Sequence, residues 1–212
     1  MEILKNFIVF EGIDGSGTTT QLNILEKFFL LNQARLSLPP FYKTFEPTDG
    51  SIGKIIRSCL REEAVLRAET IAMLFAADRN EHVFGSGGVA ERCGRGELVV
   101  SDRYVPSSLV YQGITCGDEL PAALNRVFPV PELLLFFDID PETAQKRIAG
   151  REQKEIYETM DFQIQVRRRY KTLLSQFSAE GVRIGIIDSS KPPEEAAREV
   201  WEHIQKMPIF KG

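Results

Sequence analysis

The chain has 212 residues, of which 43% are hydrophobic and 26% charged, and its net charge is −4 at pH 7. This balance is typical of one soluble globular domain, and it excludes intrinsic disorder and a basic nucleic-acid coat. No hydrophobic run is long enough to span a bilayer, and the first residues lack the pattern of a signal peptide. The three cysteines are far apart and only two histidines exist, which argues against a disulfide framework or a zinc site. We therefore expect a cytoplasmic protein with neither nucleic-acid nor membrane partners.

Short hydrophobic segments alternate with helical patterns along the chain. The predicted strands are residues 7–10, 42–45, 98–100, 133–137 and 183–187. These segments are short and mainly hydrophobic, as expected for strands that are covered on both faces. Hydrophobic residues at steps of three and four predict helices between the strands, for example over 156–177 and 197–204. The alternation predicts a single α/β domain over residues 1–212, with a parallel sheet between two helical layers.

A glycine-rich turn follows the first predicted strand and precedes a helix. Its residues are Gly12, Ile13, Asp14, Gly15, Ser16, Gly17, Thr18, Thr19 and Thr20. In this context the backbone N–H groups and the positive end of the helix bind phosphate. The P-loop pattern has lysine where Thr18 stands, whereas Thr19 keeps the hydroxyl that binds Mg²⁺. The turn therefore predicts a phosphate site that lacks one cation, with a purely structural tight turn as the alternative.

Two further groups of residues suggest a nucleotide site. Asp102 and Arg103 follow the third predicted strand, at the sheet edge where such folds bind ligands. Asp102 could hold Mg²⁺ and Arg103 could bind phosphate, unless the two form an ordinary ion pair. Phe75 and Arg79 are four residues apart and share one helix face, which suits stacking and hydrogen bonding of a nucleobase. The alternative is a core Phe75 with Arg79 extending to solvent.

Taken together, these segments resemble the thymidylate kinase family. The resemblance rests on FEGIDGSGTTTQ, LFAADR, SDRYVPSSLVYQG and LLFFDIDPETAQKRI, in order from Phe10 to about Lys191. It implies a three-layer P-loop NTPase fold with a five-stranded parallel sheet and a short lid at about residues 147–158. It also implies ATP and Mg²⁺ as cofactors, dTMP as phosphoryl acceptor, and a homodimer.

The same resemblance implies roles for residues around the acceptor. The residues implied in dTMP binding are Asp14, Glu46, Arg57, Phe75, Arg79, Arg103, Ser108, Tyr111 and Gln112. Asp14 would bind the deoxyribose 3′-hydroxyl, with a turn residue as the alternative, and Tyr111 would crowd a ribose 2′-hydroxyl. Arg57 and Arg103 would hold the acceptor phosphate. Many bacterial members have arginine directly before the glutamate that Glu46 matches, and here that residue is Phe45.

The lid is implied to supply a catalytic arginine. Family members with glycine inside the P-loop, as at Gly15, draw this arginine from the lid, where Arg147 and Arg151 stand four residues apart. An arginine there would stabilise charge on the transferring phosphoryl group, unless the two merely face solvent. Arg167 to Arg169 are consecutive and diverge around a helix, so they cannot meet at one phosphate. The missing lysine leaves two alternatives open, a nucleotide-binding pseudokinase and a kinase of another deoxynucleoside monophosphate.

Overall fold

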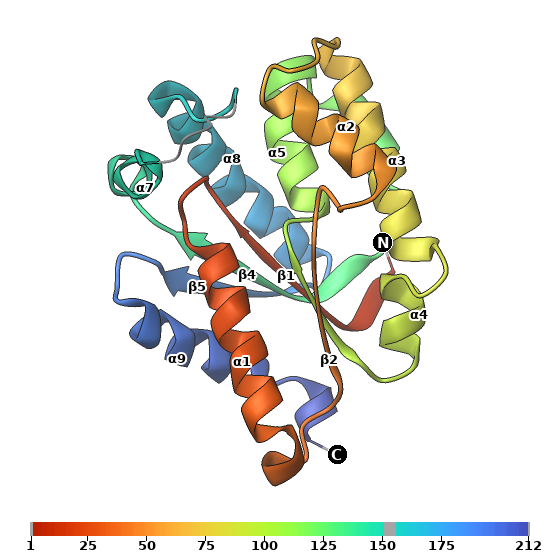
Figure 1. Ribbon diagram of the computed structural model, residues 1–212, viewed down its shortest axis with the longest axis vertical. Helices are drawn as coiled ribbons and strands as arrows, with labels where there is room; N and C mark the ends of the chain where they lie inside the picture. The colour runs from red at the N-terminus through yellow and green to blue at the C-terminus, as the bar shows by residue number, and fades with distance from the viewer. Residues whose placement is uncertain (1, 151–155, 212) are drawn as a thin grey trace.

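The computed structural model describes residues 2–150 and 156–211. At its centre the described strands form one parallel sheet in the order β2-β3-β1-β4-β5 (Figure 1). Their bounds are β1 (Ile3–Gly12), β2 (Phe41–Phe45), β3 (Leu98–Asp102), β4 (Val130–Asp138) and β5 (Arg183–Asp188). Each predicted strand is confirmed, and the P-loop NTPase fold class with its five-stranded parallel sheet is confirmed with them.

Helices connect the strands and cover both faces of the sheet. Their bounds are α1 (Thr18–Leu36), α2 (Ser51–Leu60), α3 (Ala68–Phe84), α4 (Val89–Gly94), α5 (Val105–Cys116), α6 (Glu119–Asn125), α7 (Pro141–Ile148), α8 (Met160–Ala179) and α9 (Pro193–Ile204), followed by the 3₁₀ turn η1 (Pro208–Phe210). The pattern over 156–177 placed the start of α8 too early, because the helix begins at Met160 and Ile156 lies in the segment before it. No helix of the described residues is long and hydrophobic enough to cross a membrane.

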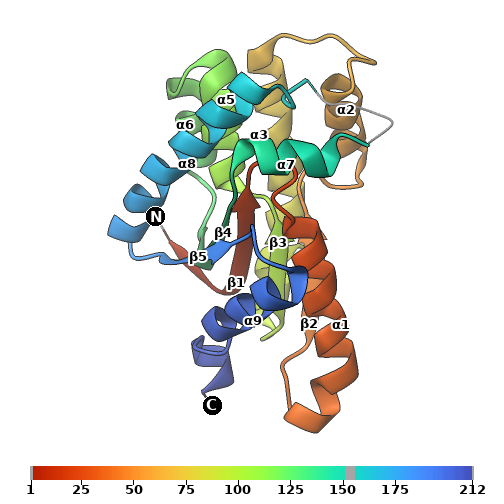
Figure 2. The ribbon, with the colours of Figure 1, turned by 90° about the vertical axis from the view of Figure 1, so that its left-hand side faces the viewer.

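Alternate side chains of β1 build two separate cores. Ile8 and Phe10 pack with α1 and α9 on one face, whereas Phe7 and Val9 pack with α3, α5 and α8 on the other. All four side chains are fully buried. Figure 2 shows α1 and α9 on one side of the sheet and α5, α6 and α8 on the other. Residues 7–10, 98–100 and 133–137 of the inner strands are buried and hydrophobic throughout, as predicted, whereas the edge strands β2 and β5 are only partly buried and carry Lys43 and Arg183.

The topology leaves one edge of the sheet open for a ligand. After β1 the chain builds β2 and β3 on one side of it, and then β4 and β5 on the other. Such a reversal of strand order opens a crevice at the carboxyl ends of the strands. Gly12 ends β1 and Asp102 ends β3, so the glycine-rich turn and the Asp102–Arg103 pair meet there.

Candidate active site

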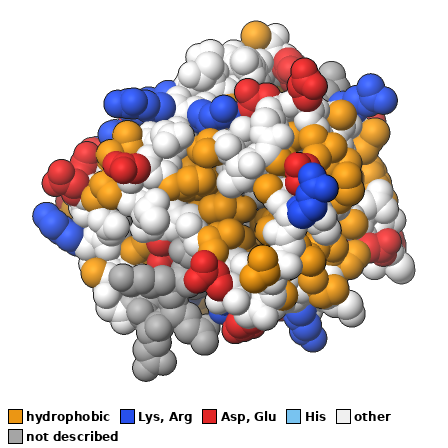
Figure 3. Space-filling view, turned by 90° about the horizontal axis from the view of Figure 1, so that it is seen from above, with side chains coloured by type: hydrophobic (Ala, Val, Ile, Leu, Met, Phe, Trp, Pro, Cys, Tyr) orange, Lys and Arg blue, Asp and Glu red, His pale blue; other side chains and the backbone are white. Residues whose placement is uncertain are grey.

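A cavity of about 640 Å³ lies at the carboxyl ends of β1 and β3. The residues of its wall that the sequence predicted as site residues are Ile13, Asp14, Gly15, Gly17, Thr18, Thr19, Thr20, Glu46, Arg57, Phe75, Arg79, Asp102, Arg103, Ser108, Tyr111, Gln112 and Arg147. Figure 3 looks onto this end of the molecule, where hydrophobic side chains gather among scattered charges. One concave site thus brings together segments from α1, α3, α5 and α7.

The glycine-rich turn has the backbone that phosphate binding requires. Gly15 and Gly17 adopt φ of 81° and 90°, in the left-handed region that favours glycine. A Cβ atom at Gly15 would lie 2.5 Å from the backbone oxygen of Ala144, so the turn packs closely against α7. Helix α1 begins at Thr18 and directs its N-terminus to the cavity. Free N–H groups and the helix dipole there favour an anion.

Thr19 and Asp102 lie side by side at the end of this turn. The Thr19 hydroxyl donates a hydrogen bond of 2.5 Å to Oδ2 of Asp102. The other carboxylate oxygen, Oδ1, is buried and has no hydrogen-bond partner among the described residues. A buried carboxylate oxygen without a donor is a ready ligand for a hard divalent cation. The residues present therefore fit Mg²⁺, and the alternative of an Asp102–Arg103 ion pair is wrong.

Arg103 instead pairs with Asp14 beside the carboxyl end of β1. Its Nη2 lies 2.5 Å from Oδ1 of Asp14, and its Nη1 donates to the backbone oxygen of Gly12 at 3.1 Å. Gln163 of α8 holds the second oxygen of Asp14 at 2.7 Å and accepts from the Asp14 backbone N–H at 3.0 Å. Asp14 is thus more than a turn residue, because an arginine and an amide fix its carboxylate inside the cavity.

The base-sized end of the cavity is organised by a buried ion pair. Nη2 of Arg79 lies 2.6 Å from Glu46, and the two side chains are only 1% and 3% exposed. Arg79 also donates to Ser108 at 3.0 Å and to Asn125. The alternative in which Arg79 extends to solvent is therefore wrong. His82 contacts the other oxygen of Glu46 at 2.9 Å and so extends the network away from the cavity.

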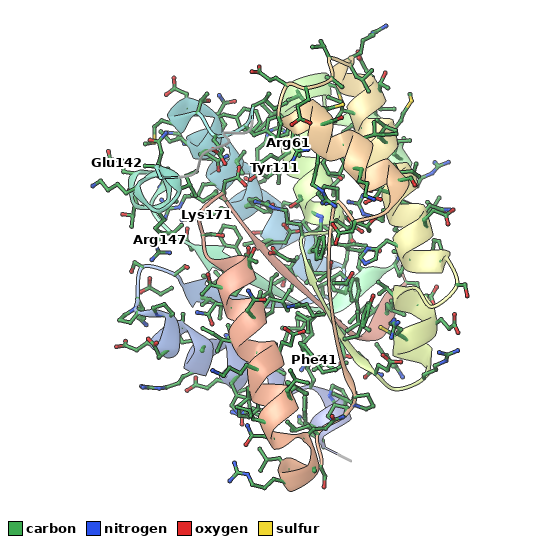
Figure 4. The ribbon with its side chains drawn as sticks, in the orientation of Figure 1. Phe41, Arg61, Tyr111, Glu142, Arg147 and Lys171 are labelled. Carbon is green, nitrogen blue, oxygen red and sulfur yellow. The ribbon has the colours of Figure 1, made fainter. Side chains whose placement is uncertain are left out.

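Three more side chains complete this end of the cavity. Phe75 is half-buried and lines the cavity from the same face of α3 as Arg79. Oε1 of Gln112 and the hydroxyl of Tyr111 are buried and have no hydrogen-bond partner among the described residues. The Tyr111 ring points from α5 toward α8 and lies between Arg103 and Tyr157 (Figure 4). The pocket therefore offers a stacking face and an unsatisfied acceptor.

Arg57 lines the cavity but bonds to the loop that follows β2. It donates to the backbone oxygens of Pro47, at 2.5 Å, and Thr48, and its Nη2 lies 2.7 Å from Asp49. Asp78 of α3 holds the same loop through the backbone N–H and the hydroxyl of Thr48, both at 2.7 Å. A phosphate role for Arg57 stays a prediction, since these donors are occupied.

The cationic side chains near the turn differ in where they point. Arg147 extends from the end of α7 toward the loop after β5, where Nη2 donates to the backbone oxygen of Ser189 at 2.8 Å (Figure 4). Its Nη1 would lie 3.8 Å from a Cβ atom at Gly17, directly beside the phosphate loop. Arg151 and the middle of the predicted lid, residues 151–155, lie outside the described residues.

The three consecutive arginines of α8 diverge, as predicted. Arg167 pairs with Asp138 at 2.7 Å, whereas Arg169 pairs with Asp118 at 2.5 Å on the side of α6. They reach different neighbours, and neither lines the cavity.

Sequence reasoning missed several residues that organise the site. Three of them bond directly to predicted site residues: Gln163 to Asp14, Asn125 to Arg79 and His82 to Glu46. The fourth, Glu11, accepts from the backbone N–H of Tyr104, next to Arg103. For Glu11 a signal was available, because it is a charged residue directly after four hydrophobic residues of the predicted strand. For the others the contacts join distant segments, such as Gln163 and Asp14 at 149 residues apart, and no local pattern marks them.

The fold and the site together define a class of protein. A phosphate loop, a hydroxyl–carboxylate pair that fits Mg²⁺ and an adjoining base-sized pocket on a parallel sheet are the parts of a P-loop nucleotide kinase. The family model described as Thymidylate kinase matches residues 10–200. The chain belongs to the thymidylate kinase family.

Relatives along nearly the whole chain support this assignment. The chain is 39% identical over 209 residues to a Treponema pallidum protein named "Putative thymidylate kinase", covering 97% of this chain and 98% of the relative. It is 37% identical over 206 residues to a protein of Pyrobaculum aerophilum named "Probable thymidylate kinase", covering 97% and 99%. A protein of the same name from Methanocaldococcus jannaschii is 36% identical over 204 residues, covering 95% and 97%. The resemblance drawn from the motifs is confirmed.

Proposed function

We propose that this protein transfers the γ-phosphoryl group of ATP to dTMP and so produces dTDP for deoxynucleotide synthesis. The observation that carries this proposal is that one cavity joins a phosphate loop to a base pocket with an unsatisfied buried acceptor. The family of the chain supports the same reaction. Phosphoryl transfer needs positioning and charge stabilisation more than covalent chemistry, and the cavity supplies both without a nucleophilic side chain.

The base pocket matches the hydrogen-bonding edge of thymine. Thymine presents an N3–H donor, and Oε1 of Gln112 is a buried acceptor that still needs one. Its O4 is an acceptor, and Arg79 is a rigid, fully buried donor at the same end of the cavity. Cytosine has an acceptor at N3 and would leave Gln112 unsatisfied. The pocket therefore favours a thymine-like base, with Phe75 as its stacking face.

The remaining residues divide between the two phosphate groups. Arg103 and Asp14 would hold the acceptor side, where Arg103 neutralises the dTMP phosphate and Asp14 binds the deoxyribose hydroxyl. The glycine-rich turn from Gly12 to Thr20 would cradle the phosphates of ATP, and Arg147 would stabilise charge on the group in transfer. Mg²⁺, held by Thr19 and Asp102, would neutralise the charge that builds up on the phosphate oxygens. The lid arginine Arg151 is proposed on the resemblance alone.

We also infer a homodimer and a cytoplasmic location, as the resemblance implies. Large hydrophobic side chains are exposed on α2 and α3, including Ile55 at 46% and Met73 at 51%. Exposed hydrophobic surface of this kind is the usual basis of an interface between subunits. Sedimentation of the purified protein at several concentrations tests the dimer, and a monomer throughout would contradict it.

A substrate panel tests the proposed reaction. ADP formation is measured with ATP, Mg²⁺ and either dTMP, dUMP, dCMP or dGMP as acceptor. We expect turnover with dTMP and weaker turnover with dUMP, because uracil keeps N3–H but lacks the 5-methyl group. We expect little turnover with dCMP, because cytosine has no N3–H to satisfy Gln112. Gln112→Leu should raise the KM for dTMP at least tenfold, whereas Gln165→Leu at an exposed position of α8 should not. No turnover with any acceptor would favour the pseudokinase, and a preference for dGMP or dCMP would favour the other kinase.

A further inference from the structure

Glu11 is a fully buried carboxylate at the end of β1 that has no part in the reaction proposed above. It accepts hydrogen bonds on both oxygens. Oε1 accepts from the backbone N–H groups of Tyr104, at 3.0 Å, and Ser107, at 3.2 Å. Oε2 accepts from the hydroxyls of Ser107 and Tyr170, each at 2.7 Å. Of these donors, Tyr104 lies in the turn between β3 and α5, which carries Arg103, and Ser107 lies in the first turn of α5.

The backbone of Arg103 has an unfavourable conformation, which contacts with neighbouring residues must stabilise. Its φ is 71°, in the left-handed region, which is unfavourable for a residue other than glycine. The backbone N–H of Arg103 donates to Phe10 at 2.9 Å, and its carbonyl oxygen accepts from Ser101 at 2.8 Å. Glu11 fixes the next peptide through the N–H of Tyr104. Hydrogen bonds thus hold the backbone on both sides of Arg103, and Glu11 accepts one of them.

The side chain of Arg103 is linked to Glu11 as well. Its Nη1 donates to the Ser107 hydroxyl at 3.1 Å, and that hydroxyl donates in turn to Glu11. Burial raises the pKa of Glu11 to about 7 even though the neighbouring Arg103 guanidinium, which attracts the carboxylate, lowers it. The opposite end of the guanidinium reaches Asp14 in the cavity. A chain of contacts therefore runs from Glu11 through Ser107 to the cation that faces the acceptor.

A charged residue in this strand needs a reason beyond packing. The four preceding residues of β1, positions 7–10, are hydrophobic and fully buried, and burying a carboxylate among them costs free energy. A hydrophobic side chain of similar volume would often be neutral or stabilising at such a place. It could not, however, accept hydrogen bonds from the backbone of the β3–α5 turn and from the first turn of α5.

We propose that Glu11 is a positioning residue for phosphoryl transfer, which holds the β3–α5 turn in its strained conformation and so fixes Arg103 at the acceptor phosphate. The proposal rests on the role proposed above for Arg103. Glu11 itself lies behind the turn and does not line the cavity. Its loss should therefore affect the acceptor and spare the ATP side.

Steady-state kinetics of three variants test this proposal. We expect Glu11→Gln to raise the KM for dTMP about tenfold and to lower kcat, while the KM for ATP stays within about twofold. Gln keeps the size of the side chain but removes the charge. Ser107→Ala removes the hydroxyl that links Arg103 to Glu11 but keeps the carboxylate itself, and it should give the same pattern even if Glu11→Gln folds poorly. Glu132→Gln, on the neighbouring strand β4 outside the cavity, is the matched control and should leave both constants unchanged.

A double-mutant cycle separates this proposal from the assignment of Arg103. Arg103→Ala should impair dTMP use on its own, and Glu11→Gln added to it should cost less than a further twofold, because both act through one cation. If Arg103→Ala impairs dTMP use while Glu11→Gln and Ser107→Ala do not, the positioning role of Glu11 is overturned and the proposed function stands. The positioning role is also overturned if the losses in dTMP use caused by the two substitutions multiply in the double variant. If Arg103→Ala has no effect on dTMP use, the acceptor role of Arg103 fails and the role of Glu11 fails with it.

Discussion

At the scale of single residues, Phe75 carries the clearest expectation for base recognition. It lines the cavity beside Arg79 and is only half-buried, so its ring is available to a ligand. Phe75→Ala should weaken dTMP binding by about 1–3 kcal/mol, the range of base–aromatic stacking, and leave ATP binding nearly unchanged. Calorimetry with each nucleotide measures this. Asn80→Ala, at an exposed position of the same helix, is the control, and equal losses for both nucleotides would point to a damaged core instead.

Tyr111 carries the expectation for the sugar. Its hydroxyl is buried and unpartnered among the described residues, and its ring contacts Tyr157, Phe162 and Tyr170. Truncation to alanine would open a hole among these rings, so Tyr111→Phe is the cleaner change. Removal of the hydroxyl should make room for a ribose 2′-hydroxyl and raise kcat/KM for ribothymidine monophosphate relative to dTMP several-fold. Tyr42→Phe on β2 serves as control, and an unmoved ratio would mean that Tyr111 only packs.

At the scale of elements, the question is how the phosphate loop works with Thr18 in place of lysine. The N-terminus of α1 supplies part of the missing charge, and α7 brings Arg147 beside Gly17. Arg147 forms no ion pair within residues 2–150 and 156–211, whereas Lys191 of the same cavity is paired with Glu199. Arg147 is therefore the better placed of the two to replace the lysine.

This arrangement predicts coupling between the two positions. Arg147→Ala should lower kcat by about 10³-fold or more, as loss of an arginine finger does, and Thr18→Lys should leave activity similar or higher. In the double variant the new lysine should reduce the fall in kcat that Arg147→Ala causes, because both groups act on the same phosphates. Single-turnover rates measure each variant, with Lys146→Ala on the exposed side of α7 as control. Strictly additive effects would contradict the compensation.

At the scale of the whole molecule, Glu11 links stability to pH. Burial raises its pKa from 4.5 to about 7, so between these values the folded protein keeps a proton that the unfolded chain loses. The folded state then binds more protons, and the contribution of Glu11 to stability falls as pH rises from about 4.5 to 7 and levels off above.

Glu11→Gln removes this titration. The free energy of unfolding of the variant minus that of the wild type should therefore rise with pH between 4.5 and 7, by at most about 1.4 kcal/mol per pH unit. Denaturant unfolding at a series of pH values measures the difference, and shifts from all other groups cancel in it. If the difference between the two unfolding free energies did not change with pH, Glu11 would have the same pKa in the folded and unfolded states.

Local patterns in the sequence predicted the layered fold and the phosphate loop, and the family resemblance implied most of the other residues of the cavity wall. Strands and helices follow from local hydrophobic patterns, and the phosphate loop is one continuous segment between β1 and α1. Residues such as Phe75 and Arg79 could be paired because a helix places i and i+4 on one face. Each of these inferences depends on neighbours along the chain, which is why a single sequence was sufficient.

The contacts that hold the predicted site residues in place could be seen only in the folded protein. Arg103 could pair with Asp102 beside it, yet it pairs with Asp14, which is 89 residues away, while Asp102 turns to Thr19. Glu11 gains its role because β1, the β3–α5 turn and α8 meet around one carboxylate. Contacts of this kind are set by the packing of distant segments and leave no periodic trace in the sequence. The strained backbone of Arg103 likewise exists only because the folded protein holds it from several sides.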